Sequence, residues 1–186
     1  VTPYSIPFVK PLQTSDKTYI HREGVWLQLQ WEDYTGRGEA APLEGFSREN
    51  VKEVHYALEG FHRAIDGENF DRKDLFSLVH IHTEGIPSAR FALETAVFDL
   101  LAQEEKKPLA LYLNPHAPTE IEVNGISGIH MPEDGFRVIK VKVGFRNIFD
   151  EIEHLVMLTQ SFGKDILFRL DVNGAFDLPQ AIRFCK

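Results

Sequence analysis

The segment VIKVKVG at residues 138–144 decides the fold prediction. Its apolar residues are β-branched and alternate with lysines before a glycine, which is typical of a strand. Because side chains alternate between the two faces of a strand, Lys140 and Lys142 share one face and the apolar residues between and beside them share the other. Repulsion between neighbouring ammonium groups favours a neutral lysine, the form that acts as a base. The alternative interpretation is an exposed strand with two solvated lysines.

The segment ILFRLDVNG at residues 166–174 has the same two-faced pattern, with Arg169, Asp171 and Asn173 on one face. If the two strands are neighbours in a parallel sheet, about 4.8 Å apart, the lysines and Asp171 converge near the carboxyl ends of the strands. Active sites lie at that end in barrels and open α/β sheets. A carboxylate beside an amide suits a hard cation such as Mg²⁺. Salt bridges that close the sheet are the alternative.

The flanking segments predict alternating strands and helices. A short strand is expected at residues 121–125 and helices at 150–161 and from 178 to 184, an order typical of parallel α/β structure. The stretch at 126–137 contains two glycines and a proline, and it is shorter than a usual crossover helix. The apolar stripe expected for the helix at 150–161 is Ile152, Leu155, Val156 and Leu158.

The first part of the chain predicts a small antiparallel sheet followed by helices. Residues 24–31 alternate as a half-buried strand, and the polar turn at 32–38 leads into a return strand that starts at Gly38. Ser47 is the expected N-cap of an amphipathic helix, with Glu49 in its first turn, and Ser88 is the expected N-cap of a second helix. We therefore expect an α+β domain over residues 1–115 and parallel α/β structure over 116–186.

Composition narrows the functional classes. The 186 residues include 43% hydrophobic and 26% charged residues, enough for a packed core. The net charge of −8 argues against a nucleic-acid or anionic membrane partner, and no apolar run reaches the roughly 20 residues that span a bilayer. The single cysteine, Cys185, excludes an internal disulfide and favours a cytoplasmic protein. His80 and His82 lack a third metal ligand at a suitable spacing.

Four segments together resemble a known family. KVKVG at 140–144 followed by RLDVNGA at 169–175 is similar to the paired motifs of the enolase superfamily, in its muconate-lactonizing branch. GEAAPLEGFS at 38–47 and PSARFALETA at 87–96 resemble the capping domain of the o-succinylbenzoate synthase family. The resemblance implies an α+β capping domain followed by the first strands of a (β/α) TIM-type barrel.

The resemblance also implies a role for each motif residue. Lys142 would abstract the proton α to the carboxylate of a small-molecule substrate, and Lys140 would stabilise that carboxylate and favour the neutral form of the base. Asp171 would be the first of three acidic ligands of Mg²⁺, or of Mn²⁺, while Asn173 and Arg169 would support the site.

The implied activity is a Mg²⁺-dependent dehydration in menaquinone biosynthesis. Phe46 and Ser47, with the loop at 14–17, would reach toward the substrate from the capping side. A dipeptide epimerase or N-acylamino acid racemase of the same superfamily is one alternative, and a non-catalytic fragment is another. A barrel unit takes roughly 30 residues, so we expect the barrel to be incomplete in a chain that stops at Lys186.

Overall fold

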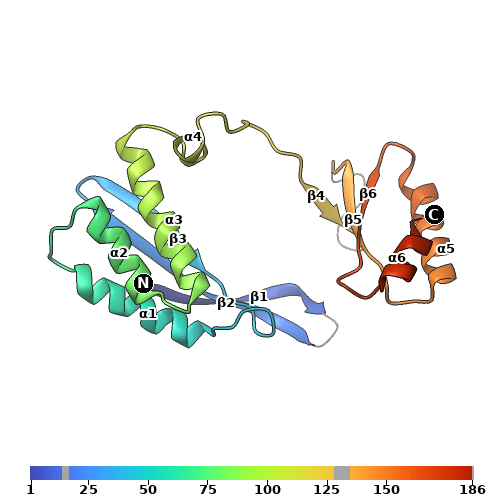
Figure 1. Cartoon of the computed structure of the whole chain (residues 1–186), viewed down its shortest axis with the longest axis horizontal. Helices are drawn as coiled ribbons and strands as arrows, with labels where there is room; N and C mark the ends of the chain where they lie inside the picture. Colours follow the sequence, from blue (N-terminus) through green and yellow to red (C-terminus); the bar gives the residue numbers. More distant parts are fainter. Residues whose placement is uncertain (14–16, 128–134, 186) are drawn as a thin grey trace. The chain divides into compact units, whose positions relative to one another are not determined.

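The computed structural model describes residues 1–13, 17–127 and 135–185. These residues form two compact units, which we call the amino-terminal unit, Val1–Ala117, and the carboxyl-terminal unit, Pro118–Lys186. Figure 1 shows the elements of each unit. None of the helices in the described part of the chain is both long enough and apolar enough to cross a membrane. The two units are described separately below.

The amino-terminal unit contains an antiparallel sheet with the strand order β1-β2-β3. Trp31 pairs directly with Tyr34, so the turn between β2 and β3 is only two residues long. The prediction that the return strand starts at Gly38 was therefore wrong, because polar residues 34–37 continue the ladder. The strands are β1 (Thr2–Gln13), β2 (Thr18–Trp31) and β3 (Tyr34–Ala40).

Helices follow this sheet, and α3 lies along β3 (Figure 1). The two backbones approach closely, since a Cβ added at Gly36 or Gly38 would lie 2.0 Å from a carbonyl oxygen of α3. Only glycine permits that spacing. The main core of the unit is continuous from β2 to α1, α2 and α3. The helices are α1 (Val51–Ile65), α2 (Arg72–His82), α3 (Pro87–Glu104) and α4 (Leu109–Leu113).

The helix N-termini differ from those predicted. Asn50, not Ser47, is the N-cap of α1, and it forms a capping box with Glu53. The helix α3 begins after Ile86, whose side chain makes no capping bond. Ser88 instead donates from its backbone N and its hydroxyl to Oε1 of Glu49, at 2.9 and 2.5 Å. Glu49 therefore serves the start of α3 rather than the first turn of α1.

The carboxyl-terminal unit contains a parallel sheet with the strand order β4-β5-β6. Ile139, Val141 and Val143 are buried on one face, where α5 and α6 pack (Figure 1). The stretch at 126–137, predicted to be too short for a usual crossover helix, falls largely on residues 128–134, outside the described residues. The elements are β4 (Asn124–Ile126), β5 (Val138–Lys142), α5 (Ile148–Phe162), β6 (Leu167–Asp171) and α6 (Leu178–Phe184).

The buried stripe of α5 is rotated from the predicted one. Ile152 and Val156 are 43% and 50% exposed, whereas Leu155, Leu158 and Phe162 pack on the buried strand β5. The stripe begins with Glu151, which is 1% exposed. An acidic residue at the head of the stripe concealed it, because the sequence pattern counted only apolar side chains.

Candidate active site

The two polar motif segments lie on adjacent strands, in register. Lys140 is opposite Arg169 and Lys142 is opposite Asp171. Because β5 and β6 are parallel, all four residues belong to the same face of the sheet, opposite the face that packs on α5. The pattern that predicted this shared charged face is thus matched by the strand register.

Asp171 lies at the end of β6 and is held by two donors. The ammonium of Lys140 lies 2.6 Å from Oδ2, and the backbone N–H of Asn173 donates to Oδ1 at 3.1 Å. The bond from Lys140, and then that from Asn173, lower the pKa of Asp171 below its usual value, against slight desolvation. The side chain of Asp171 is 24% exposed, so this carboxylate is anchored but accessible.

The turn after β6 depends on a left-handed backbone. Asn173 has φ of 48° and Gly174 has φ of 77°. Asn and Gly are the residues that adopt this conformation most readily. The turn brings the backbone N–H of Asn173 back to the side chain of Asp171, and the predicted supporting role of Asn173 in the site stays a prediction.

Arg169 has a partner that the sequence did not indicate. Its Nη1 donates to Oδ1 of Asn124, on β4, at 3.0 Å. The three strands of this sheet are therefore joined across the polar face, from Asn124 to Arg169 and from Lys140 to Asp171. Alternation of side chains along β4 could have indicated the face to which Asn124 belongs. The strand was predicted at residues 121–125, however, and its start was three residues too early.

The turn after β5 is bound by a second residue that the sequence did not indicate, Glu151 in the first turn of α5. Oε1 of Glu151 accepts hydrogen bonds from the backbone N–H groups of Gly144, Phe145 and Arg146, at 2.9, 2.9 and 3.0 Å. This turn begins two residues after Lys142, whose side chain is exposed. The sequence pattern did not identify Glu151 as a buried residue of α5, because it counted only apolar side chains.

Phe46 and Ser47 belong to the amino-terminal unit and have different surroundings. Phe46 is 71% exposed. The Ser47 hydroxyl accepts a hydrogen bond from the N–H of Leu43 at 3.0 Å, which closes the turn before α1. Their predicted contact with a substrate stays a prediction, and residues 14–16 of the predicted loop lie outside the described residues.

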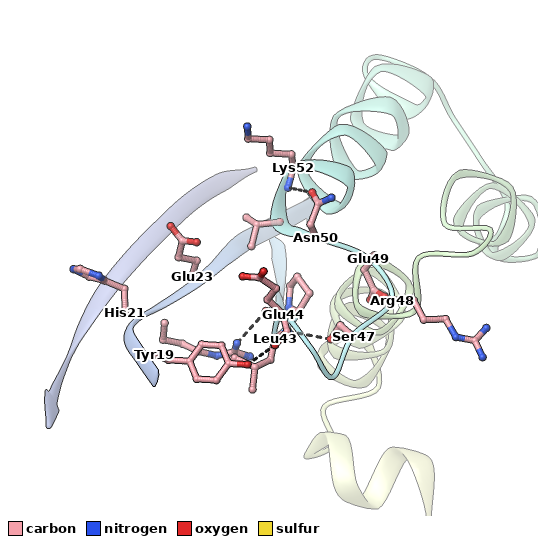
Figure 2. A pocket seen from close by; sticks show the side chains of 13 residues that line it. Tyr19, His21, Glu23, Leu43, Glu44, Ser47, Arg48, Glu49, Asn50 and Lys52 are labelled. Carbon is pink, nitrogen blue, oxygen red and sulfur yellow. Dashed lines mark hydrogen bonds between the residues drawn. The ribbon is translucent and has the colours of Figure 1, made fainter. Parts of the chain in front are cut away.

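Ser47 lines a pocket of about 470 Å³ in this unit. Figure 2 shows Tyr19 and His21 extending from β2, and the side chains of residues 43–44 and 47–50 lining the pocket from the loop before α1. The hydroxyl of Tyr19 donates to the backbone oxygen of Glu44, and Arg22 donates to the backbone oxygens of residues 41 and 42. These bonds fix the loop that leads into α1.

The described residues contain one anchored carboxylate at the strand ends. Within the described ranges there is no group of three or more His, Cys, Asp or Glu side chains placed to hold a metal. Carboxylate oxygens are ligands that a hard cation prefers, and the carboxylate of Asp171 is held in place and 24% exposed. It therefore fits a place in a Mg²⁺ site as one ligand.

The sequence matches two known protein families. The family described as MenC, N-terminal domain, matches residues 1–100, and the family described as Enolase C-terminal domain-like matches residues 130–186. The chain belongs to the enolase superfamily. Within that superfamily, its amino-terminal unit belongs to the MenC N-terminal domain family.

Curated relatives include enzymes of two kinds. The chain is 26% identical to the L-Ala-D/L-Glu epimerase of Bacillus subtilis, over 96% of this chain and 52% of the relative. It is 27% identical to the o-succinylbenzoate synthase of Yersinia enterocolitica, over 98% of this chain and 52% of that enzyme. The chain spans about half the length of the curated relatives it matches.

Solved structures show the same fold. The L-Ala-D/L-Glu epimerase from Bacillus subtilis gives a TM-score of 0.81 at 22% identity, over 98% of this chain and 55% of that chain. The o-succinylbenzoate synthase from Thermosynechococcus elongatus, complexed with Mg in its active site, gives 0.68 at 21% identity, over 98% and 54%. The amino-terminal unit is an α+β capping domain, and the carboxyl-terminal unit contains the first strands of a (β/α) barrel, as predicted.

Proposed function

We propose that the gene product carrying this chain is an o-succinylbenzoate synthase, a Mg²⁺-dependent dehydratase of menaquinone biosynthesis. The observation that carries the proposal is the match of residues 1–100 to the MenC N-terminal domain family. The polar face shared by β5 and β6 supports a reaction that starts with removal of a proton next to a carboxylate.

Lys142 is proposed as the base. Its side chain is exposed on the polar face, in register with Asp171. Lys142 takes the α-proton of the substrate, and the electron pair of the broken C–H bond moves into the carboxylate to give an enediolate. The resulting ammonium returns the proton to the departing hydroxyl group, so that water leaves and one double bond forms. A single lysine on one side of the substrate accounts for both proton transfers.

The other residues are proposed to manage charge. Lys140 and Arg169 place two further positive charges beside the position where negative charge develops on the substrate carboxylate. Asp171 is proposed as one ligand of Mg²⁺, and the N–H of Asn173 holds that ligand in place. A bound Mg²⁺ supplies electrostatic stabilisation of the enediolate.

The test uses the full gene product with Mg²⁺ and the hydroxycyclohexadiene carboxylate precursor. We expect formation of o-succinylbenzoate, and a loss of about 10²–10⁴-fold in kcat for Lys142→Ala, the usual contribution of a general base. Lys164→Ala is the matched control, because Lys164 is an exposed lysine in the turn between α5 and β6. Absence of dehydration by a folded, Mg²⁺-supplied protein would overturn the proposal.

Dipeptide epimerisation is the second candidate. It is favoured by the 26% identity to the Bacillus subtilis epimerase, nearly the same as the identity to the Yersinia synthase. The two candidates differ in their products from labelled solvent. An epimerase in deuterium oxide incorporates deuterium at the α-carbon of a dipeptide with inversion, whereas the dehydratase leaves dipeptides unlabelled.

A further inference from the structure

We infer that Glu151 is a positioning residue that holds the end of β5, and with it Lys142, against the end of β6. The inference rests on the proposed role of Lys142. Glu151 lies in the first turn of α5, on the face of the sheet opposite the polar side chains, so it touches no reacting atom. Its effect on the chemistry would be exerted through the backbone.

Three hydrogen-bond donors converge on one buried oxygen of Glu151. Three consecutive backbone N–H groups, of residues 144–146, donate to Oε1 of Glu151 at 2.9–3.0 Å. The residue is 1% exposed, and among the residues that the structure describes none donates to Oε2. A buried carboxylate is costly unless hydrogen bonds compensate for lost hydration. For Glu151 the turn provides these hydrogen bonds, all of them to Oε1, so the contacts of this oxygen fix the turn.

The helix α5 has a different residue as its N-terminal cap. The side chain of Asn147 accepts hydrogen bonds from the N–H groups of Phe149 and Asp150, at 3.0 and 3.1 Å. These bonds already satisfy the start of the helix. The contacts of Glu151 therefore serve the connection between β5 and α5 rather than the helix terminus.

The turn after β5, which Glu151 binds, also contacts the end of β6. The N–H of Val143 donates to the backbone oxygen of Asp171 at 3.0 Å. Gly144 has φ of 96°, and a Cβ added there would lie 3.0 Å from Cβ of Ala175 and 3.1 Å from Cγ1 of Val172. The turn held by Glu151 is thus packed on the segment that carries Asn173, and a shift of the turn would move both strand ends.

The test compares Glu151→Ala and Glu151→Gln in the full gene product. In the alanine variant we expect kcat to fall about 10- to 100-fold, the scale of a displacement near 1 Å, with KM changed less than about threefold. The glutamine variant keeps one oxygen acceptor of the same shape, so we expect it to recover most of the loss. Glu153→Gln is the matched control, since Glu153 is exposed on the same helix and its change should leave kcat unaltered.

A second measurement does not depend on activity. Hydrogen–deuterium exchange, read by mass spectrometry on peptides covering residues 143–147, should accelerate at least tenfold in Glu151→Ala and much less in Glu151→Gln. Protected amides in the alanine variant, or an alanine variant with wild-type kcat per folded molecule, would overturn the inference. If the gene product shows no dehydratase activity, the proposed function fails, and the exchange data together with α-proton exchange on a dipeptide still decide the role of Glu151.

Discussion

The two units of this chain bury their apolar residues in different ways. The amino-terminal unit has a continuous core drawn from the sheet and three helices, and its sheet meets α3 backbone to backbone. The carboxyl-terminal unit buries chiefly one strand, β5, and leaves Leu167 of the neighbouring strand 66% exposed. The candidate catalytic residues lie in the second unit, on the face of β5 that the core does not use. The larger apolar core and the candidate catalytic residues therefore belong to different units of the chain.

The largest expected effect separates the two units by core truncation. Phe61 in α1 is 1% exposed, so Phe61→Ala should lower the free energy of unfolding of the amino-terminal unit by about 3–5 kcal/mol. Leu167→Ala in β6 should cost less than about 0.5 kcal/mol, because the side chain is mostly exposed. Urea unfolding followed by tryptophan fluorescence measures the first effect, since both tryptophans of the chain lie in β2.

Phe91→Ala is the control for that experiment, because Phe91 is 66% exposed on α3 and its truncation should change stability little. Equal losses for Phe61→Ala and Phe91→Ala would contradict the described core of the amino-terminal unit.

A smaller effect compares the helix caps of the two units. Asn50 caps α1 and Asn147 caps α5 in the same way, since the side-chain oxygen of each accepts hydrogen bonds from two backbone N–H groups. Asn50→Ala should destabilise the amino-terminal unit by about 0.5–2 kcal/mol, whereas Asn50→Asp should retain most of the capping energy. The tryptophan signal should register Asn50→Ala and remain unchanged for Asn147→Ala. A shift of the same size from both variants would mean that the units unfold together.

The smallest expected effect concerns two carboxyl groups, one in each unit. Burial tends to raise the pKa of Glu49, but hydrogen bonds from Ser88, together with those from the backbone of residues 48 and 49, lower that pKa overall. The hydrogen bond from Lys140 is the main cause that lowers the pKa of Asp171. A carboxyl group with a lowered pKa stabilises the fold above its usual pKa, and this contribution is lost as the pH falls through the lowered value. Because Lys140 is the main cause of the lowered pKa of Asp171, Lys140→Met should raise that pKa toward the usual value of an aspartate.

Carbon-13 NMR of the carboxyl groups measures this change. The Glu49 titration serves as an internal control, because its donors belong to the other unit and should be unaffected. An unchanged Asp171 titration in Lys140→Met would show that the ion pair between these residues does not set its pKa.

The strands β5 and β6 were predictable because their two faces differ sharply in chemistry. Alternation of lysines with valines, and of charged with apolar residues in the second strand, identifies both the strand and the side that each residue faces. The same reasoning brought Lys140, Lys142, Arg169 and Asp171 together before their register was known. Strand alternation therefore predicts which side chains share a face, and the catalytic roles of those side chains stay predictions.

Features formed by single contacts were not predictable in this way. The helix α2 was missed because Val79 is its only residue that is fully buried, so its apolar stripe is weak. The cap of α1 was placed at Ser47 although Asn50 with Glu53 has the spacing of a capping box. Glu151 and Asn124 act through partners that are fixed only by the fold, 5–7 and 45 residues away.

The contact of Gly36 and Gly38 with α3 has a consequence for how this capping domain changes over evolutionary time. Main-chain oxygens of α3 are the nearest atoms at both positions, so the backbones themselves limit how closely β3 and α3 approach. The loop that follows β3, and that forms one wall of the pocket in Figure 2, inherits a fixed starting point. The frame from which this loop departs is therefore defined by main-chain contacts, separately from the side chains that line the pocket.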